Sequence, residues 1–212
     1  IEKYLNEKVR YFMGDTPINL NSPEQLSWLI YSRKPNDKHE WIDMMPTDSY
    51  SDGVKKYSSI LYKTRAKQCT ACKGYGKVRK TRKDGKPFAR ETKCSSCNGL
   101  GYLFTQTNEI AGMKFKAPDY KWITANGWST SKVHLNLLAS IAKAKGMTDA
   151  EEFLNKVIRL SALDTYISSF VDGISHNIKS DNKLHVRLLQ HRTATGRFSG
   201  ADPNMQNMPR GG

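Results

Sequence analysis

Two copies of the motif CxxCxGxG constrain this chain more than any other feature of its sequence. They occupy residues 69–76 and 94–101 and contain every cysteine of the chain: Cys69, Cys72, Cys94 and Cys97. Two such pairs supply four thiolates, the number that closes a tetrahedral zinc site. The glycines after each second cysteine allow sharp turns, so backbone N–H groups can point at the sulfurs. We predict a structural zinc ion here, because four protein ligands leave no open position for catalysis. Two unligated reduced pairs or a redox dithiol are the alternatives.

Basic residues are concentrated around these cysteines. The 212-residue chain carries 34 Lys and Arg against 20 Asp and Glu, a formal net charge of +14. Between Lys63 and Lys93 there are twelve basic residues and only two acidic ones, Asp84 and Glu91. A surplus of this size favours a polyanionic partner, nucleic acid first and an acidic membrane surface second. No apolar run is long enough to span a membrane and no signal peptide is visible, so we expect a soluble, cytoplasmic protein.

Helix signals occur in the first third of the chain. The pattern predicts a helix over Glu2–Met13 and a short strand over 18–20. Ser22 as N-cap, Pro23 at the first helical position and Gln25 two residues later predict a capping box and a helix that continues toward Pro35. We expect a loop over 36–52 and a helix over 54–67.

The second half of the sequence has two further helix starts. Ser129, Thr130 and Ser131 predict an N-cap, followed by a helix to Gly146 with Val133, Leu137, Leu138 and Ile141 facing inward. A second capping box at 148–151 opens a long helix to Gly173. A strand is expected over 184–190, and a loop beyond it.

The sequence near the C-terminus resembles a signature of a known protein family. Residues 193–209 read TATGRFSGADPNMQNMP, which resembles the signature TATGRLSS-x-x-PNLQNIP of family A (Pol I-like) DNA polymerases. INLNS at 18–22, STS at 129–131 and TYI at 165–167 match further motifs of that family in order. The resemblance covers most of 1–44 and 118–212, and leaves the cysteine module outside it as an insertion.

The resemblance implies an α+β fold, in which a helical thumb is followed by the beginning of a palm and a small four-cysteine zinc-binding module is inserted. The implied segments are 1–44 as the first part of the thumb, 45–117 as the insertion with its zinc module at 69–101, 118–173 as the long thumb helices, and 174–212 as the start of the palm. We expect a phage-like, split or truncated polymerase, because the chain begins at Ile1 and stops within a motif.

The resemblance also implies contacts to primer-template DNA, the expected partner. Arg197 would reach the minor-groove edge of the primer terminus. Backbone contacts near the primer-template junction would come from Gln190, Thr195, Ser199, Asn204, Gln206 and Asn207. The hydroxyls of Ser129, Thr130 and Ser131 would sit at a helix N-terminus, a natural phosphate site. The alternatives are a polar, turn-rich loop for 193–209 and an ordinary helix cap for 129–131.

The catalytic carboxylates of the family do not occur here. Its DYS-type and HDE-type motifs are absent, so the two-metal Mg²⁺ ligands would lie outside this chain and we name no catalytic residue. We therefore expect the chain to act with the remaining palm and fingers, in the same or a separate chain, as part of a DNA-directed DNA polymerase in a bacterial or phage-infected cell, associated with the nucleoid through DNA. Alone, it should be inactive.

Two other functions fit parts of the sequence. One is a stand-alone zinc-containing DNA-binding or processivity module, and the other is a DnaJ-type chaperone, whose zinc repeats share the CxxCxGxG form. Within the polymerase interpretation, residues 69–101 would form a basic flap on the upstream duplex. That flap would display Lys77, Arg79, Lys80, Arg82, Lys83 and Lys86. A loop that serves a protein partner is the alternative.

Overall fold

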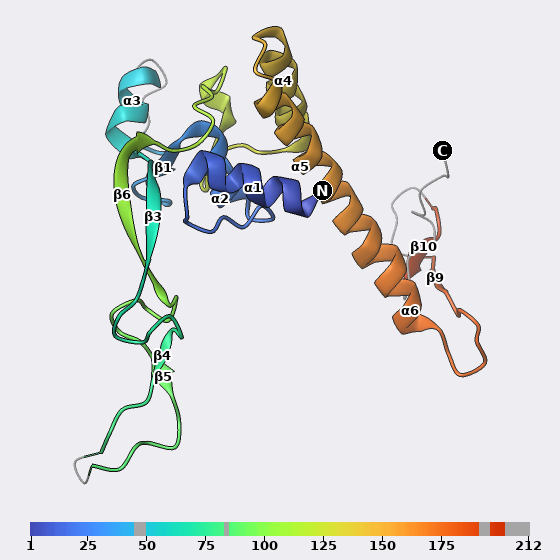
Figure 1. Cartoon of the computed structure of the whole chain (residues 1–212). Coiled ribbons are helices and arrows are strands. Elements are labelled where there is room, and N and C mark those ends of the chain that lie inside the picture. Colours follow the sequence, from blue (N-terminus) through green and yellow to red (C-terminus); the bar gives the residue numbers. More distant parts are fainter. Residues whose placement is uncertain (45–49, 83–84, 191–195, 202–212) are drawn as a thin grey trace. The chain divides into compact units, whose positions relative to one another are not determined.

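The computed structural model describes residues 1–44, 50–82, 85–190 and 196–201 (Figure 1). The chain divides into two compact units, Ile1–Asn155 and Lys156–Gly212. The fold mixes helices with small two-stranded sheets, as the α+β prediction requires. Within the described residues, no helix combines the length and apolar character needed to cross a membrane.

The first two helices begin and end where local signals place them. α1 (Glu2–Met13) buries Leu5, Val9 and Met13, one per turn of a single face. α2 (Pro23–Tyr31) starts at the predicted N-cap, where the Ser22 hydroxyl accepts from the Gln25 N–H. The Gln25 side chain does not complete the capping box, since it accepts from the Asn19 N–H at 2.7 Å. Residues 18 and 19 are irregular and Leu20 lies in a turn, so the strand predicted over 18–20 is wrong.

The helix predicted over 54–67 is confirmed only as far as Tyr57. α3 (Tyr50–Tyr57) ends early, and the chain continues as β2 (Ser58–Ile60), which pairs with β1 (Arg33–Pro35). β3 (Tyr62–Gln68) then pairs in antiparallel register with β6 (Tyr102–Ile110), with a bulge between Tyr62 and Thr64. Figure 1 shows β3 and β6 side by side as a long ribbon. The pairing partner lies about forty residues away in the sequence, which explains why local periodicity misled the prediction.

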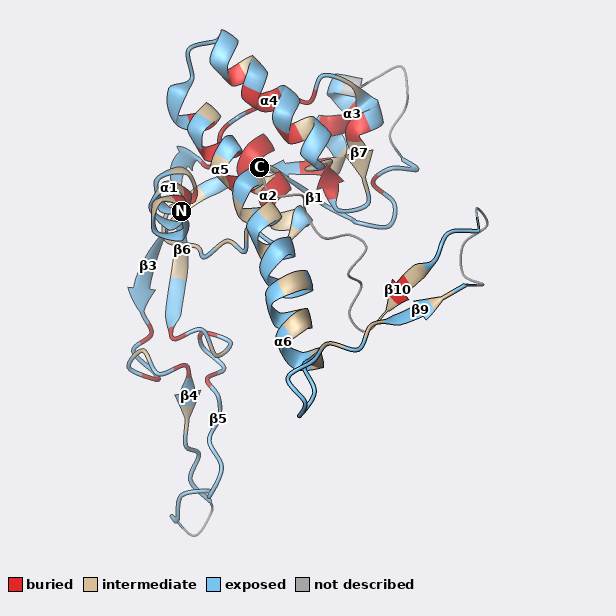
Figure 2. Cartoon of the chain, turned by 90° about the vertical axis from the view of Figure 1, so that its right-hand side faces the viewer, coloured by how far each residue is buried: buried red, intermediate tan, exposed pale blue. Residues whose placement is uncertain are grey.

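Aromatic side chains fill the core of the first unit. The short hairpin of β7 (Ile123–Thr124) and β8 (Gly127–Trp128) follows η1 (Tyr120–Trp122). Trp41, almost fully buried, packs edge-on against Trp128 at 5.6 Å and donates from Nε1 to the Thr124 carbonyl at 2.7 Å. Buried residues gather in β8 and in α2, as the red segments of Figure 2 show.

Two helices follow this core. α4 (Lys132–Ala144) starts at the predicted N-cap, Ser131, and buries Leu135, Leu138, Ala139 and Ala142. Val133 and Leu137 are exposed, so their predicted inward positions are wrong: the buried face lies one residue further round the helix. α5 (Thr148–Tyr166) carries the unit boundary within it, and its first half buries Phe153 edge-on to Phe12 at 6.0 Å.

The second unit continues the helix and ends in a strand pair. Beyond α5, η2 (Ile167–Asp172) is a π-helical segment, and α6 (Gly173–Asn177) completes the helical run. The predicted strand over 184–190 is confirmed only for β9 (Arg187–Leu189). It pairs with β10 (Ser199–Ala201), which interrupts the loop expected there.

Candidate metal centre and nucleic-acid interface

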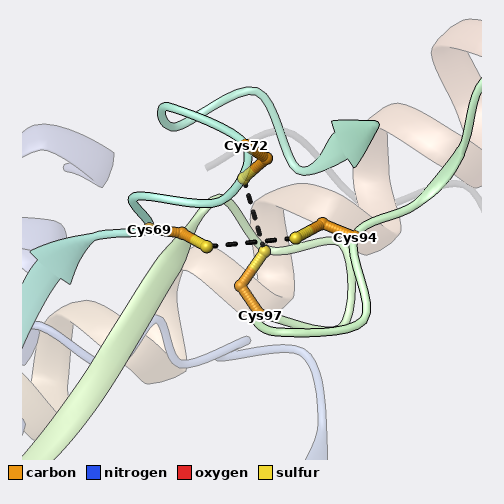
Figure 3. A group of neighbouring side chains, drawn as sticks. All are labelled: Cys69, Cys72, Cys94 and Cys97. Carbon is orange, nitrogen blue, oxygen red and sulfur yellow. Dashed lines mark hydrogen bonds between the residues drawn. The ribbon is translucent and has the colours of Figure 1, made fainter. Parts of the chain in front are cut away.

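The four cysteines meet in one buried cluster. Their Sγ atoms all lie within 4.8 Å of one another, with Cys69 and Cys94 at 3.9 Å and Cys72 and Cys97 at 3.7 Å (Figure 3). A tetrahedron with Zn–S bonds of about 2.3 Å has sulfur–sulfur edges of about 3.8 Å. The cluster therefore has the ligand type, number and spacing of a closed zinc site. No other group of three or more metal-ligating side chains occurs among the described residues.

Each CxxCxGxG turn is here called a knuckle, and the second knuckle repeats the geometry of the first 25 residues later. The Gly76 N–H donates to Cys72 Sγ at 3.3 Å, and the Gly101 N–H donates to Cys97 Sγ at 3.2 Å. The knuckles also bond to each other reciprocally. Cys69 N–H donates to the Gly101 carbonyl and Cys94 N–H to the Gly76 carbonyl, both at 2.9 Å. The result is a pseudo-two-fold pair of turns that presents four sulfurs to one point.

Glycine is required where the two turns cross. Gly76 has φ +70°, and a Cβ there would lie 2.3 Å from the Gly99 carbonyl oxygen. Gly101 has φ +80°, and its Cβ would lie 2.3 Å from the Gly74 carbonyl oxygen. Each backbone occupies the space that a side chain on the other would need. The repeated glycines of the motif are thus explained by contact between the knuckles as well as by the turns themselves.

Burial and hydrogen bonding shift the pKa values of the cysteine thiols in opposite directions. Burial raises the pKa of the Cys72 thiol to about 11, since a thiolate loses its hydration there. Burial acts in the same direction on Cys94, but N–H groups of Cys97 and Ser96 donate to its sulfur and lower the pKa to about 7. Four thiolates this close repel one another, so all four ionise together only around a positive ion.

Two ribbons leave the cluster. The inner ribbon, β3 with β6, is anchored to the core: the Ala66 N–H donates to Asp15 Oδ2 and the Asp15 N–H to the Thr64 carbonyl, both at 2.9 Å. The bond from Ala66, with help from Arg10, holds the pKa of Asp15 below its ordinary value. The outer hairpin pairs β4 (Lys77–Val78) with β5 (Thr92–Lys93) and extends beyond the cysteines in both views (Figures 1 and 2).

The outer hairpin displays the predicted basic residues. Lys77, Arg79, Lys80, Arg82 and Lys86 are all exposed, whereas Lys83 lies outside the described residues. Arg79 pairs with Glu91 at 3.5 Å, and the Arg82 guanidinium lies over the Phe88 ring at 5.3 Å from its centroid.

The hydroxyls of Ser129 and Ser131 are used by the cap itself. The Ser131 hydroxyl accepts from the His134 N–H, and Ser129 Oγ lies 2.7 Å from His134 Nδ1. His134 also stacks on Trp122, with ring centroids 3.8 Å apart. The cap is confirmed, and a phosphate contact by Ser129, Thr130 or Ser131 stays a prediction. His134 was not singled out from the sequence, and its position three residues after the N-cap is the signal that could have found it.

In the second unit, strand pairing brings some of the predicted DNA contacts together. Ser199 is the register partner of Leu189, so Gln190 lies next to that pair, and Arg197 is exposed just before β10. Thr195, Asn204, Gln206 and Asn207 lie outside the described residues. The described part of the predicted interface is therefore a short antiparallel pair with an amide, a guanidinium and a hydroxyl near one end.

The sequence profile of DNA polymerase family A matches residues 78–211 of this chain, more than half of its length. The chain belongs to DNA polymerase family A. This favours the polymerase interpretation over the chaperone-like alternative.

Several DNA polymerase I proteins are similar to part of the chain. DNA polymerase I of Streptococcus pneumoniae is 34% identical over 91 residues, 43% of this chain and 9% of that protein. The thermostable DNA polymerase I of Thermus aquaticus is 34% identical over 71 residues, 33% of this chain and 8% of that protein. The chain thus matches less than a tenth of the length of these relatives.

A solved structure, the POL domain of Pol1 from M. smegmatis in complex with DNA primer-template and dNTP, aligns with 98% of this chain and 21% of its own chain. The sequence identity is 19% and the TM-score 0.42.

Proposed function

We propose that this chain is the primer-template-binding segment of a DNA-directed DNA polymerase of family A, a nucleotidyltransferase that acts in DNA replication. The carrying observation is the family match over the segment in which Gln190, Arg197 and Ser199 are brought together by β9 and β10. Residues 1–44 and 118–173 would form the thumb, and 174–212 the start of the palm.

The chemistry of these side chains suits a protein that must hold any sequence. Hydroxyls, amides and a guanidinium contact phosphates and the minor-groove acceptors that all base pairs share. Arg197 would donate to the primer-terminal edge, while Gln190 and Ser199 would fix the backbone. Carboxylates outside this chain would hold the Mg²⁺ ions of the complete polymerase, which activate the 3′ hydroxyl. The chain alone would bind primer-template weakly and incorporate no nucleotide.

We further propose that Cys69, Cys72, Cys94 and Cys97 hold a structural Zn²⁺ ion. Support comes from the buried sulfur tetrahedron and from the N–H donors of Gly76 and Gly101. Metal analysis of the purified chain should give one zinc ion per molecule. Cys97→Ser should lower this content, while Ser96→Ala, an exposed neighbour in the same knuckle, should leave it unchanged. Equal zinc content in the chain and in Cys97→Ser would contradict the site.

Arg197→Ala in the complete polymerase tests the alignment role. A charge-assisted hydrogen bond contributes about 1.5–3 kcal/mol, so single-nucleotide incorporation should slow by roughly 10- to 150-fold. Duplex binding should change only a few-fold, because many phosphate contacts share that free energy. Arg197→Lys should recover the charge but not the two-pronged geometry.

Arg159→Ala, at an exposed position of α5, is the matched control and should alter neither rate nor binding. Equal losses of incorporation and binding in Arg197→Ala would count against alignment and leave Arg197 as a general phosphate contact.

A further inference from the structure

We infer that the hairpin formed by residues 77–82 and 85–93, here called the basic arm, is a binding surface for the phosphates of double-stranded nucleic acid, held in a fixed direction by the cysteine cluster. This rests on the proposed function in one respect: the duplex would be the polymerase product. The direct support is the arm's charge, its strand register and its attachment.

The arm is almost uniformly basic. Among its described residues the only acidic side chain is Glu91, which pairs with Arg79. Its exposed basic residues are Lys77, Arg79, Lys80, Arg82, Lys86, Arg90 and Lys93. Surface charge of one sign at this density repels itself, and its free energy falls when phosphates neutralise it.

The strand register places two lysines directly opposite each other. Lys77 pairs with Lys93 across β4 and β5, and like charges in this position are destabilising. The pseudo-two-fold relation supplies an internal comparison, because 25 residues separate equivalent positions of the knuckles. The equivalent pair in the inner ribbon is Gln68 with Tyr102, both uncharged. The same local fold therefore forms without the lysine pair, and an anion bound between them would remove the repulsion.

The attachment of the arm fixes which way these lysines face. Val78 packs against the cysteine cluster, and successive strand residues point to opposite faces. Lys77, which precedes Val78 in β4, therefore points away from the cluster, and its cross-strand partner Lys93 lies on the same face. The reciprocal bonds of Cys69 and Cys94 join the arm to the inner ribbon, which Asp15 anchors to the core. The knuckles and the inner ribbon thus hold the charged face of the arm in place.

The shape fits a duplex better than it fits a protein. A two-stranded ribbon enters the major groove of B-DNA, which is about 12 Å wide. Basic side chains on both strands of the arm can then reach phosphates on both sides of the groove. Protein interfaces are instead built around apolar anchors. Among the described residues of the arm the one exposed large apolar side chain is Phe88, and the Arg82 guanidinium lies over its ring; Tyr75 and Leu100 lie on the knuckles outside the arm.

The test uses the zinc-loaded 212-residue chain and a blunt duplex without a primer terminus. The arm variant carries Lys77→Gln, Lys80→Gln, Arg90→Gln and Lys93→Gln. The control carries Lys3→Gln, Lys55→Gln, Lys121→Gln and Lys143→Gln, which are exposed positions outside the arm and give the same net charge. Kd is measured against salt concentration. Each lost phosphate contact lowers the slope of log K against log salt by about 0.9, so the arm variant should lose about 3 to 4.

The control should lose less than about 1 in slope, and both variants should keep the zinc content of the parent chain. Equal slopes for the arm variant and the control overturn the inference. Tighter binding of a single strand of equal length also overturns it. If polyglutamate displaces the duplex at a lower concentration of charge than competitor duplex does, the inference fails as well, and the arm is assigned to an acidic protein.

A parallel measurement on primer-template separates the two proposals. Arm-dependent binding of the blunt duplex, without preference for primer-template, would support the arm and contradict the proposed function. If the chain prefers primer-template and the arm variant keeps the salt slope of the parent, the proposed function is supported and the role of the arm is contradicted.

Discussion

Alanine at Gly76 should weaken zinc binding by the two knuckles. The residue has φ +70°, and an added Cβ would meet the Gly99 carbonyl oxygen at 2.3 Å. An L-residue in the left-handed region costs about 1–2 kcal/mol. The apo chain can relax this strain by opening the turn, whereas the zinc-bound turn cannot.

The strain alone therefore lowers zinc affinity by roughly 5- to 30-fold. The overlap adds to this, since only a shift of the Gly99 backbone relieves it, and that backbone positions Cys94 and Cys97. We expect a total loss above about 30-fold. Gly101→Ala should give a loss of similar size, because its Cβ would meet the Gly74 carbonyl at the same 2.3 Å.

Competition with a chromophoric zinc chelator measures the affinity directly. Gly85→Ala is the matched control: its φ is +77°, yet nothing lies within 4 Å of the added Cβ, and it sits far from the cysteines along the hairpin. It should leave zinc affinity within about three-fold of the parent, since its strain falls outside the metal site. The packing argument fails if Gly76→Ala binds zinc as tightly as Gly85→Ala does.

Two further predictions concern the core. Asp15→Asn should destabilise the first unit near neutral pH, because the carboxylate that accepts from Ala66 and Arg10 has a lowered pKa. The stabilisation by the Asp15 carboxylate is fully present above its ordinary pKa of 3.8 and is lost as the pH falls through its lower pKa in the folded state. The unfolding curves of parent and variant should therefore converge in acid. A difference in stability that stays constant with pH would contradict this role of Asp15. Phe153→Ala, at a fully buried site, should lower the free energy of unfolding in urea by about 3–5 kcal/mol, against well under 1 for Val133→Ala on the exposed face of α4; comparable losses would refute the core placement.

Local signals predicted the parts of this fold that local chemistry determines. The N-caps at Ser22 and Ser131, the α1 boundaries and the cysteine knuckles all depend on residues within a few positions of one another. β3 was missed because its stability comes from β6, and because Leu61 continues the helical period of Val54 and Tyr57 beyond the end of α3. Val133 and Leu137 were misplaced because a helix with apolar residues on more than one side does not reveal which side meets the core.

In the candidate site, too, the features that depend on local sequence were predicted and those that depend on distant contacts were not. Spacing was sufficient to predict that the four cysteines come together, because each CxxC pair is a local turn and the two turns are alike. It did not reveal the Lys77–Lys93 pair, which depends on strand register, or the stacking of His134 on Trp122, which depends on packing between elements. Gln190 and Arg197 were chosen from family resemblance, and the pairing of β9 with β10 gives their nearness a structural basis.

The pairing of Tyr62 with Ile110 means that the chain leaves and re-enters the core at neighbouring points. Everything between them can therefore be lengthened, shortened or exchanged during evolution without moving the ends that the core must join. Because successive side chains of a strand point to opposite faces, only some changes in ribbon length keep the module facing the same way. Removing two residues from each strand of the inner ribbon draws the cysteine cluster about 7 Å inward and keeps every side chain on its face. Removing one residue from each would turn the module to face the other way. Related polymerases that carry such a module should differ in ribbon length by even numbers of residues per strand.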